Sequence, residues 1–497
     1  MTSGPPDPTP LRADVAVVGA GAAGLYAALA ASREGARVAL VSRSPLAESA
    51  SYWAQGGIAA ALDSGDSVDL HIEDTVKAGR GLGRLSAIGV LCAESPERVR
   101  DLAALGVHFD ADRRGALALG LEGGHSHRRV AHAGGSATGR RITRELSAIV
   151  ANDPRIEVLE NTSAIALWRR DGRCAGLLAE TPARGAGPWT AFPIAARATI
   201  LATGGAAALW ERTTNPRGAI GAGMSLAHHA GAALADLEFQ QFHPTAMLRD
   251  DEHDGFLITE AIRGEGAKLL DPDGERFVDE LAPRDQVALA VEAVRRERGE
   301  VTLDMREIDM THFPNVLLKL REAGVDPARD LVPVAPAAHY TMGGIRTDLD
   351  GRSTLPGLYA VGECACNGLH GANRLASNSL AECFVFGRRS ALAALDEPDL
   401  PAGGSAPPAP GPSPVPPPET RTALWRLAGL QRTAEGLREL SDDPFPLARM
   451  IAACALAREE SRGAHQRLDF PETDPRLDLT HAVVRGEEAD LTLEKWR

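Results

Sequence analysis

A short apolar stretch near the N-terminus opens the first recognisable unit of the chain. Val15–Val18 has the length and composition of a buried strand, and Leu25–Ser32 is an alanine-rich stretch typical of a helix. Gly19-Ala-Gly-Ala-Ala-Gly24 lies between them, and Arg37–Val41 supplies a second apolar strand. The order strand, glycine turn, helix, strand predicts one βαβ unit over residues 14–41.

The three glycines of this turn indicate a dinucleotide site. Gly19 permits the tight turn, Gly21 lets a phosphate approach the backbone, and Gly24 lets the helix pack closely on the strand. The amides at the start of the helix can then bind a pyrophosphate. The acidic residue that commonly binds the ribose of NAD is absent, because Ser42 and Arg43 follow the second strand. Arg43 leaves NADP open, although an exposed charge is the simpler explanation, and FAD is compatible because a serine hydroxyl can also contact ribose.

Two later stretches favour a flavin. Ala198–Gly205 has the pattern of a buried strand that ends in glycines, and Leu358–Glu363 is a strand that ends in a glycine and an acid. Gly371–Leu380 follows, and its Ser377-Asn-Ser379 segment is suited to a helix start. A helix N-terminus directed at a flavin would stabilise negative charge on the reduced ring.

These elements predict an α/β protein with a Rossmann-like FAD-binding domain, an inserted α+β capping domain and a C-terminal helical domain. The FAD-binding domain is split between residues 1–234 and 340–395, and the capping domain occupies 235–339 between them. A proline-rich linker is expected at 396–419, and the helical domain at 420–497.

The two ends of the chain have different patterns. Met1–Pro10 is polar and proline-rich, which predicts a disordered tail and not a signal peptide. Residues 401–418 favour an extended spacer, with recognition by a proline-binding partner as the alternative. Beyond them, apolar residues from Leu424 to Leu440 recur at helical spacing, and a second helical run is expected at Met450–Arg467.

Composition restricts the class of protein. The 497 residues allow two to four domains, and 44% hydrophobic with 24% charged residues is typical of soluble globular proteins. A net charge of −14 argues against general nucleic-acid binding. Val15–Ala31 is uncharged, but it contains three glycines and is at the short limit for a membrane span, so we predict no membrane association. The loose cluster of Cys364, Cys366 and Cys383 is expected to consist of structural thiols, with a metal or redox role as the alternative; we predict no metal site.

The inserted region is rich in polar groups that bind anions. His243, Arg263, Arg284 and His339 lie in it, and Arg374 lies in the flavin-side stretch. Each residue alone is more simply explained as structural. Together with a flavin fold they suggest two cationic anchors for a substrate with two carboxylates, because arginine binds carboxylate through a planar fork and histidine adds a directional donor.

At this point the chain resembles the succinate dehydrogenase and fumarate reductase flavoprotein superfamily, and within it the L-aspartate oxidases. The similarity covers nearly all of residues 12–395 and continues weakly into the C-terminal helices. The motifs that carry it are Ser51-Tyr-Trp-Ala-Gln-Gly-Gly57, Glu122-Gly-Gly-His-Ser-His-Arg-Arg129, His243-Pro-Thr245, Ala282-Pro-Arg284-Asp285, His339-Tyr-Thr341, His370-Gly-Ala-Asn-Arg374 and Glu460-Ser-Arg-Gly-Ala-His465.

The resemblance implies a mechanism. His243, His339 and Arg374 would hold the two carboxylates of L-aspartate, and Glu122 would orient the amino group, although a surface acid beside a turn is the alternative for Glu122. Hydride would leave the α-carbon for the flavin, and molecular oxygen or fumarate would re-oxidise FAD. In the family, the arginine that matches Arg284 transfers a proton when fumarate is reduced; an electrostatic role is the alternative.

Two positions differ from the family pattern. Succinate dehydrogenases carry a histidine that attaches FAD covalently six residues before the first glycine of the Gly-Gly pair, and this position is Ala50 here, which implies non-covalent FAD. Where the family usually has Gly-Asp-Gly, this chain has Gly221-Ala222-Gly223, so either cofactor affinity is lower or a neighbour compensates.

The predicted site residues fall into two groups. Catalysis and substrate binding are assigned to Glu122, His243, Thr259, Glu260, Arg284, His339 and Arg374. Contacts with FAD are assigned to Gly19, Gly21, Ala22, Ala23, Gly24, Ser42, Ser49, Ser51, Gln55, Gly56, Gly57, Ala164, Gly204, Glu363, Ser379 and Leu380. Thr259, Glu260 and Arg263 could support the site or only its fold.

The function that the resemblance implies is cytoplasmic oxidation of L-aspartate to iminoaspartate, the first step of de novo NAD biosynthesis through quinolinate, with possible transfer of the product to quinolinate synthase. One alternative is a fumarate reductase or succinate dehydrogenase flavoprotein subunit of a membrane complex. Ala50 and Glu122 argue against it. A second alternative is a binding protein that kept the fold without catalysis, which the combined retention of His243, Arg284, His339 and Arg374 disfavours.

Overall fold

The computed structural model describes residues 10–46, 48–182, 189–400, 415–486 and 489–496. Residues 1–9 of the predicted N-terminal tail and residues 401–414 of the predicted spacer lie outside these ranges.

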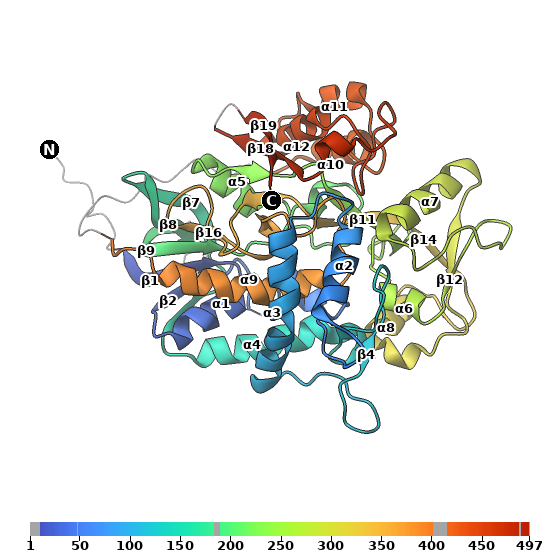
Figure 1. The fold of residues 1–497 in the computed structure, drawn as a ribbon, viewed down its shortest axis with the longest axis horizontal. Helices are drawn as coiled ribbons and strands as arrows, with labels where there is room; N and C mark the ends of the chain where they lie inside the picture. The colour runs from blue at the N-terminus through green and yellow to red at the C-terminus, as the bar shows by residue number, and fades with distance from the viewer. Residues whose placement is uncertain (1–9, 47, 183–188, 401–414, 487–488, 497) are drawn as a thin grey trace.

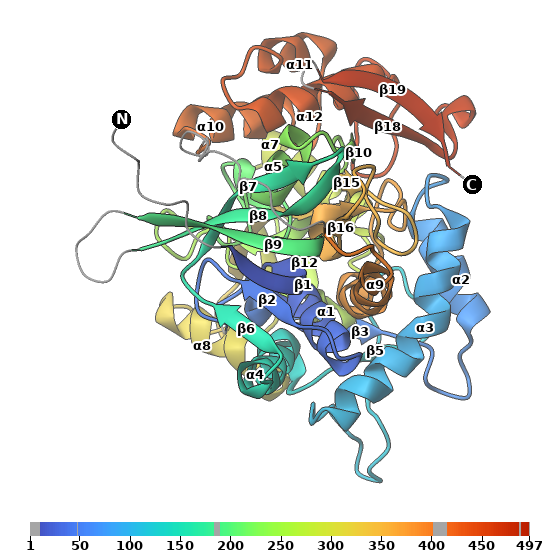
Figure 2. The ribbon, with the colours of Figure 1, turned by 90° about the vertical axis from the view of Figure 1, so that its left-hand side faces the viewer.

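A seven-stranded sheet forms the centre of the molecule (Figure 2). Its order is β6-β2-β1-β9-β8-β7, and β16 also pairs with β9. The pairs β1–β2, β1–β9, β2–β6 and β9–β16 are parallel, whereas β7–β8 and β8–β9 are antiparallel. Since β16 lies beyond the inserted unit in sequence, the chain returns to the N-terminal sheet after that insertion. The strands are β1 (Leu11–Val18), β2 (Val38–Val41), β6 (Ile156–Leu159), β7 (Ser163–Arg170), β8 (Arg173–Thr181), β9 (Thr190–Leu201) and β16 (Leu358–Ala360).

The predicted βαβ unit is present, with α1 (Ala22–Arg33) between β1 and β2. Gly19 has φ +108°, and a Cβ there would lie 2.2 Å from the carbonyl oxygen of Ala202. A Cβ at Gly24 would lie 1.8 Å from the carbonyl oxygen of Gly19. Only glycine therefore fits these two positions, and the helix can begin directly against the end of the strand.

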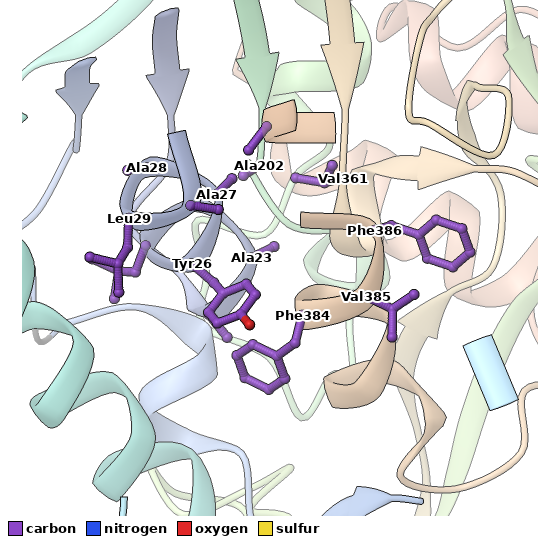
Figure 3. Close-up of a cluster of buried hydrophobic side chains, with 14 of the residues drawn as sticks. Ala23, Tyr26, Ala27, Ala28, Leu29, Ala202, Val361, Phe384, Val385 and Phe386 are labelled. Carbon is purple, nitrogen blue, oxygen red and sulfur yellow. The ribbon is translucent and has the colours of Figure 1, made fainter. Parts of the chain in front are cut away.

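Helix α9 (Asn378–Leu395) packs beside α1 on one face of the sheet (Figures 2 and 3). The rings of Tyr26 and Phe384 meet edge to face with centroids 5.2 Å apart. A Cβ at Gly387 would lie 3.3 Å from the carbonyl oxygen of Ala23, so the small residue permits the close approach of the two helices. Full burial of each aromatic ring contributes about 2 kcal/mol. This packing fixes both helix N-termini at one end of the sheet.

The inserted unit lies beside the sheet (yellow-green, at the right of Figure 1). It contains a four-stranded antiparallel sheet in the order β11-β14-β13-β12, with a separate apolar core around Val287, Val291 and Leu303. Its elements are β11 (Gln240–Met247), α6 (Glu260–Gly264), β12 (Lys268–Leu270), α7 (Arg284–Glu297), β13 (Val301–Asp304), α8 (Pro314–Glu322) and β14 (Val332–Thr341).

The C-terminal segment is less helical than the sequence pattern predicts. The apolar spacing from Leu424 to Leu440 is divided between α10 (Pro418–Leu427) and α11 (Ala434–Leu440), and α12 covers Pro446–Ala457. The expected helical run to Arg467 was too long. Arg458 instead turns inward, where its Nε donates to Glu238 Oε1 at 2.7 Å and its Nη1 to Glu460 Oε1 at 3.0 Å.

Two C-terminal strands complete a second central sheet that the sequence pattern did not predict. Its order is β17-β15-β10-β18-β19, with β10 antiparallel to β18. Its strands are β10 (Leu234–Ala235), β15 (Gly344–Arg346), β17 (Ala365–Cys366), β18 (Thr480–Arg485) and β19 (Asp490–Lys495). The remaining elements are β3 (Ile58–Ala59), α2 (Val68–Ala78), α3 (Leu85–Ala104), β4 (Leu119–Gly120), β5 (Val130–Ala131), α4 (Thr138–Asn152) and α5 (Ala222–His229).

Over the described ranges, none of the helices combines the length and the apolar character that crossing a bilayer requires. All six cysteines are free thiols. The same ranges contain no group of three or more histidine, cysteine, aspartate and glutamate side chains placed to hold a metal ion.

Candidate active site

A cavity of about 1010 Å³ is lined by the glycine turn after β1, the start of α9 and the inner edge of the inserted unit. Of the residues assigned to FAD from the sequence, all but Gly24 line it. Gly24 instead lies in the first turn of α1, where it packs closely against the carbonyl oxygen of Gly19. All seven residues assigned to catalysis and substrate binding line the cavity, so the fold brings segments from three distant parts of the chain to one space.

The nucleotide end of the cavity lies at the start of α1. The Ala22 amide donates to Ser51 Oγ at 3.1 Å, which fixes the 51–57 segment against the helix. The Ser42 hydroxyl donates to the backbone carbonyl two residues ahead at 2.6 Å, and its oxygen can still accept a bond from ribose. Arg43 is exposed, with Nη2 at 3.4 Å from the carbonyl oxygen of Gly218.

Several buried polar atoms along the cavity form no hydrogen bond with another described residue. Ser49 Oγ, Gln55 Oε1 and Thr203 Oγ1 are buried, and no other described residue forms a hydrogen bond with them. Buried polar groups are normally hydrogen-bonded, so orphaned atoms along a long cavity indicate a polar ligand. Two helix N-termini at the same cavity suit a pyrophosphate and an anionic ring system. These residues fit FAD.

Ala50 and Ala222, the two positions that differ from the family pattern, also line the cavity. Ala50 offers no side-chain nucleophile for covalent attachment. Ala222 is the first residue of α5 and supplies no carboxylate. Glu363, on the same cavity, accepts a hydrogen bond from the Thr341 amide at 2.9 Å. Burial raises the pKa of Glu363 to about 7, so this acid can carry its proton near neutral pH.

Ser377 joins the predicted cofactor and substrate segments. It precedes α9 with φ +60°, a left-handed conformation that non-glycine residues seldom adopt. Its Oγ accepts from the Gly57 amide at 3.2 Å and donates to Glu122 Oε2 at 2.7 Å. The other oxygen, Glu122 Oε1, accepts no hydrogen bond from a described residue, although His132 Nε2 lies 3.5 Å away.

Glu122 is ionised in this site. Burial alone would raise its pKa, but the nearby His132 and the Ser377 hydroxyl stabilise the carboxylate and hold the pKa at about 2. The Glu122 side chain is buried at 2% exposure, so this negative charge is directed into the cavity and not into solvent.

His243 and His339 face each other across neighbouring strands β11 and β14, with ring centroids 5.1 Å apart. Thr214 Oγ1 lies 2.8 Å from His339 Nδ1 and fixes that ring. Burial, together with Arg284 and Arg374, lowers the pKa of both histidines well below the usual value. The two imidazoles are therefore neutral at neutral pH and can donate one hydrogen bond each.

Two arginines converge on one amide. Arg284 Nη1 and Arg374 Nη2 donate to Gln241 Oε1 at 3.2 and 3.1 Å. Arg284 Nε also donates to Glu260 Oε2 at 2.5 Å, and Arg374 Nη1 donates to Ser379 Oγ at 2.6 Å. Burial and the neighbouring Arg284 lower the pKa of Arg374 to about 10, which still leaves it a cation at neutral pH.

The α6 segment supports these arginines from the inserted unit. Thr259 is the residue before α6 and lines the cavity. Glu260 lies between Arg284 and Arg263, whose Nη2 is 3.3 Å from its Oε2. Arg263 is fully buried and does not line the cavity, so it supports Glu260 from behind.

Tyr340 and Gln241 are functional candidates that the sequence reasoning did not single out. The Arg374 guanidinium lies over the Tyr340 ring at 4.3 Å, and the Tyr340 hydroxyl donates to Glu382 Oε2 at 2.8 Å. Burial raises the pKa of Tyr340 well above its usual value, so it remains a donor. Both lie within two residues of a predicted site histidine, and this adjacency is the sequence feature that could have identified them.

The comparisons with known proteins identify the class as an FAD-dependent flavoprotein oxidoreductase, which this cavity fits. The family model "FAD binding domain" matches residues 14–380, and "Fumarate reductase flavoprotein C-term" matches residues 433–496. A quinol fumarate reductase of E. coli has a TM-score of 0.87 at 30% identity, over 98% of this chain and 96% of that one. The predicted α/β flavoprotein fold and FAD cofactor are thus confirmed.

Among curated relatives, the L-aspartate oxidase of Caulobacter vibrioides is 46% identical over 96% of this chain and 97% of its own length. The L-aspartate oxidase of Streptomyces coelicolor is 42% identical over 96% and 92%. The chain belongs to the L-aspartate oxidase family. The resemblance derived from the sequence motifs is confirmed.

Proposed function

We propose that this protein oxidises L-aspartate to iminoaspartate with non-covalently bound FAD. The observation that carries the proposal is the ionised, buried Glu122, whose Oε1 accepts no hydrogen bond within the described residues. It shares the cavity with Arg284 and Arg374. A four-carbon dicarboxylate with one ammonium group matches this arrangement, because its carboxylates can face the cationic arginines and the neutral histidine donors while its ammonium group faces the Glu122 carboxylate.

The substrate carboxylates have two sets of donors. Arg374 is held in one plane by the Tyr340 ring and by Ser379, which suits a forked contact with a carboxylate. His243 and His339 lie together and offer single directional donors to the other carboxylate. Glu122 receives the ammonium group, so the three contacts select one face of the α-carbon.

When bound, FAD would supply the acceptor for the hydride that leaves the α-carbon. The substrate nitrogen first loses a proton to solvent, because only the neutral amine can form the C=N bond, and the resulting iminium ion loses a second proton to give iminoaspartate. The residues of the chain bind and orient the substrate. Arg284 carries its positive charge beside Glu260 and Gln241, where it can stabilise negative charge that develops on the substrate. Thr259 and Glu260 complete this side of the cavity.

Domain roles follow the same division. We propose that residues 1–234 and 340–395 bind FAD, that 235–339 cap the substrate, and that 420–497 form a supporting C-terminal domain. The predicted cofactor contacts are proposed to bind FAD through the amides of the Gly19–Gly24 turn and the start of α9.

The wider role is proposed from the activity of the relatives. Molecular oxygen or fumarate would re-oxidise the flavin, and the reaction would take place in the cytoplasm as the first step towards NAD. Iminoaspartate is an unstable imine, which favours direct transfer to quinolinate synthase.

Anaerobic reduction of the flavin tests the activity. L-aspartate should bleach the flavin absorbance of the purified holoprotein, whereas succinate should leave it unchanged. Bleaching by succinate and not by L-aspartate would support the fumarate reductase or succinate dehydrogenase alternative, whose solved relative is 30% identical against 46% for the aspartate oxidase relative. Acid precipitation tests the cofactor linkage, since Ala50 leaves no attachment atom at that position and the yellow colour should remain in the supernatant.

A further inference from the structure

The loop between α2 and α3 makes a two-pronged ion pair with the inserted unit. Arg80 Nε donates to Asp285 Oδ2 at 3.0 Å, and Arg80 Nη2 donates to Asp285 Oδ1 at 3.1 Å. The Asp285 side chain is 6% exposed and that of Arg80 is 27% exposed. A planar, partly buried fork of this kind fixes orientation as well as distance.

The backbone of Arg80 is held from two further directions. Arg80 has φ +55°, in the left-handed region that non-glycine residues rarely occupy. Its carbonyl oxygen accepts from Arg462 Nη1 in the C-terminal segment at 2.6 Å. The preceding carbonyl, of Gly79, accepts from the Ala372 amide at 3.1 Å, two residues before Arg374. The loop thus has a fixed place relative to the substrate-binding Arg374.

Asp285 is the neighbour of Arg284, and these are the first two residues of α7. The side chain of Arg284 bonds to Glu260 and Gln241, both within the inserted unit. The position of Arg284 relative to the flavin side of the cavity therefore depends on contacts that fix α7 against the rest of the molecule. The Arg80–Asp285 pair is such a contact, at the N-terminal end of the helix.

We propose that Arg80 is a positioning residue for the reaction, which holds Arg284 at the substrate through Asp285. The inference rests on the proposed function, because it concerns the rate of substrate oxidation. Through Arg462 it also connects the C-terminal segment to the substrate cavity. Arg80 does not line the cavity, so its effect is on the placement of Arg284 and not on substrate contact.

Stopped-flow reduction of the holoprotein flavin by L-aspartate tests this role. Arg80→Gln should lower the limiting rate about 10-fold or more, while the apparent Kd for aspartate and the FAD content change little, because a small displacement of a catalytic group acts mainly on the rate. Arg80→Lys should recover only part of the rate, since it keeps the charge but loses the planar two-pronged contact. Asp285→Asn should reproduce the Arg80→Gln loss. Arg33→Gln is the matched control, because Arg33 of α1 forms an ion pair with Asp101 of α3 at 3.1 Å. The rate of flavin reduction in this variant should not change.

A double-mutant cycle separates positioning from general stability. If Arg80 acts through Arg284, Arg80→Gln in an Arg284→Lys background should cost far less than it does alone. Independent losses that multiply, an unchanged rate in Arg80→Gln, or an equal loss in Arg33→Gln would each overturn the inference. If wild-type flavin is not reduced by L-aspartate at all, it is the proposed function that fails. Reduction of wild type and Arg80→Gln at the same rate would overturn this inference alone.

Discussion

The hydroxyl of Ser377 donates a hydrogen bond to Glu122 Oε2 at 2.7 Å, between residues 255 positions apart. One oxygen of the Glu122 carboxylate is thereby fixed from the start of α9, and the other is left to the cavity. Because Ser377 also accepts from the Gly57 amide, the acid proposed to bind the amine and the predicted cofactor segment share one anchor. This arrangement makes specific predictions.

Glu122→Gln should impair L-aspartate oxidation far more than fumarate reduction. The amide keeps the shape of the side chain but loses the charge that pairs with ammonium, and loss of one partner of a buried charge pair costs about 2–5 kcal/mol. We expect kcat/KM for aspartate to fall about 30-fold or more. Glu73→Gln, in an exposed position on α2, is the control and should change neither reaction. Equal losses in both reactions would remove Glu122 from amine binding.

Gly123→Ala should reduce both reactions. A Cβ at Gly123 would lie 2.1 Å from Glu260 Oε1, so the Glu260 carboxylate must move and Arg284 loses its partner. Steady-state kinetics should show a fall of about 10-fold or more in kcat. Gly89→Ala is the matched control, because a Cβ there, inside α3, meets nothing within 4 Å. It should leave the kinetics unchanged and stabilise the protein by about 0.4–1 kcal/mol.

Substrate affinity should be insensitive to histidine titration near neutral pH. Burial and the neighbouring arginines lower the pKa of His243 and His339 well below the usual value. A group with a lowered pKa stays neutral as pH falls through about 6.5, so its donor role does not change there. In a Glu363→Gln background, which removes the cavity acid whose pKa is raised to about 7, binding of fumarate, followed by its effect on the flavin spectrum, should be constant between about pH 6 and 8. A large loss of affinity as pH rises through about 6.5 would mean that a protonated histidine binds the dicarboxylate.

Removal of Arg129 should destabilise the folded state strongly. Arg129 is fully buried, donates to both oxygens of Asp66 at 2.8 and 2.9 Å, and donates to Asp74 at 2.5 Å. Arg129→Met leaves two carboxylates without their cation, at a cost of about 3–5 kcal/mol in guanidinium unfolding. Arg306→Gln breaks an ion pair of the more exposed Arg306 with Asp304 and should cost less than about 1 kcal/mol. Similar losses in the two variants would show that the buried triad contributes no more than a surface pair.

The cofactor half of the fold could be predicted because its signals are local. The glycines of the first turn, the apolar strand before it and the alanine-rich helix after it are adjacent in sequence, and tight backbone contacts at Gly19 and Gly24 leave no alternative residue. The C-terminal strands could not be predicted in this way. β18 is stabilised by pairing with β10, and no short-range pattern reports a partner so distant in the chain.

For the site, the charged residues and histidines of distinctive motifs were found, whereas the neutral Gln241 and Tyr340 were missed. A histidine beside a proline or an arginine after a proline is noticeable in sequence. Gln241 became important only because two arginines from different segments meet at its Oε1. The helical run predicted to Arg467 was too long. Arg458 donates to the buried carboxylates of Glu238 and Glu460, and these contacts outweigh helix propensity.

The pairing of β10 with β18 has a consequence for biosynthesis. Leu234 lies opposite Val484, so this sheet cannot close until the β18 strand has left the ribosome, about 250 residues after β10. Strands β15 and β17 are translated earlier, yet they lack their full sheet until β18 follows. A nascent flavoprotein stalled before that point would therefore expose apolar strand edges, and we expect its survival in the cell to depend on chaperones.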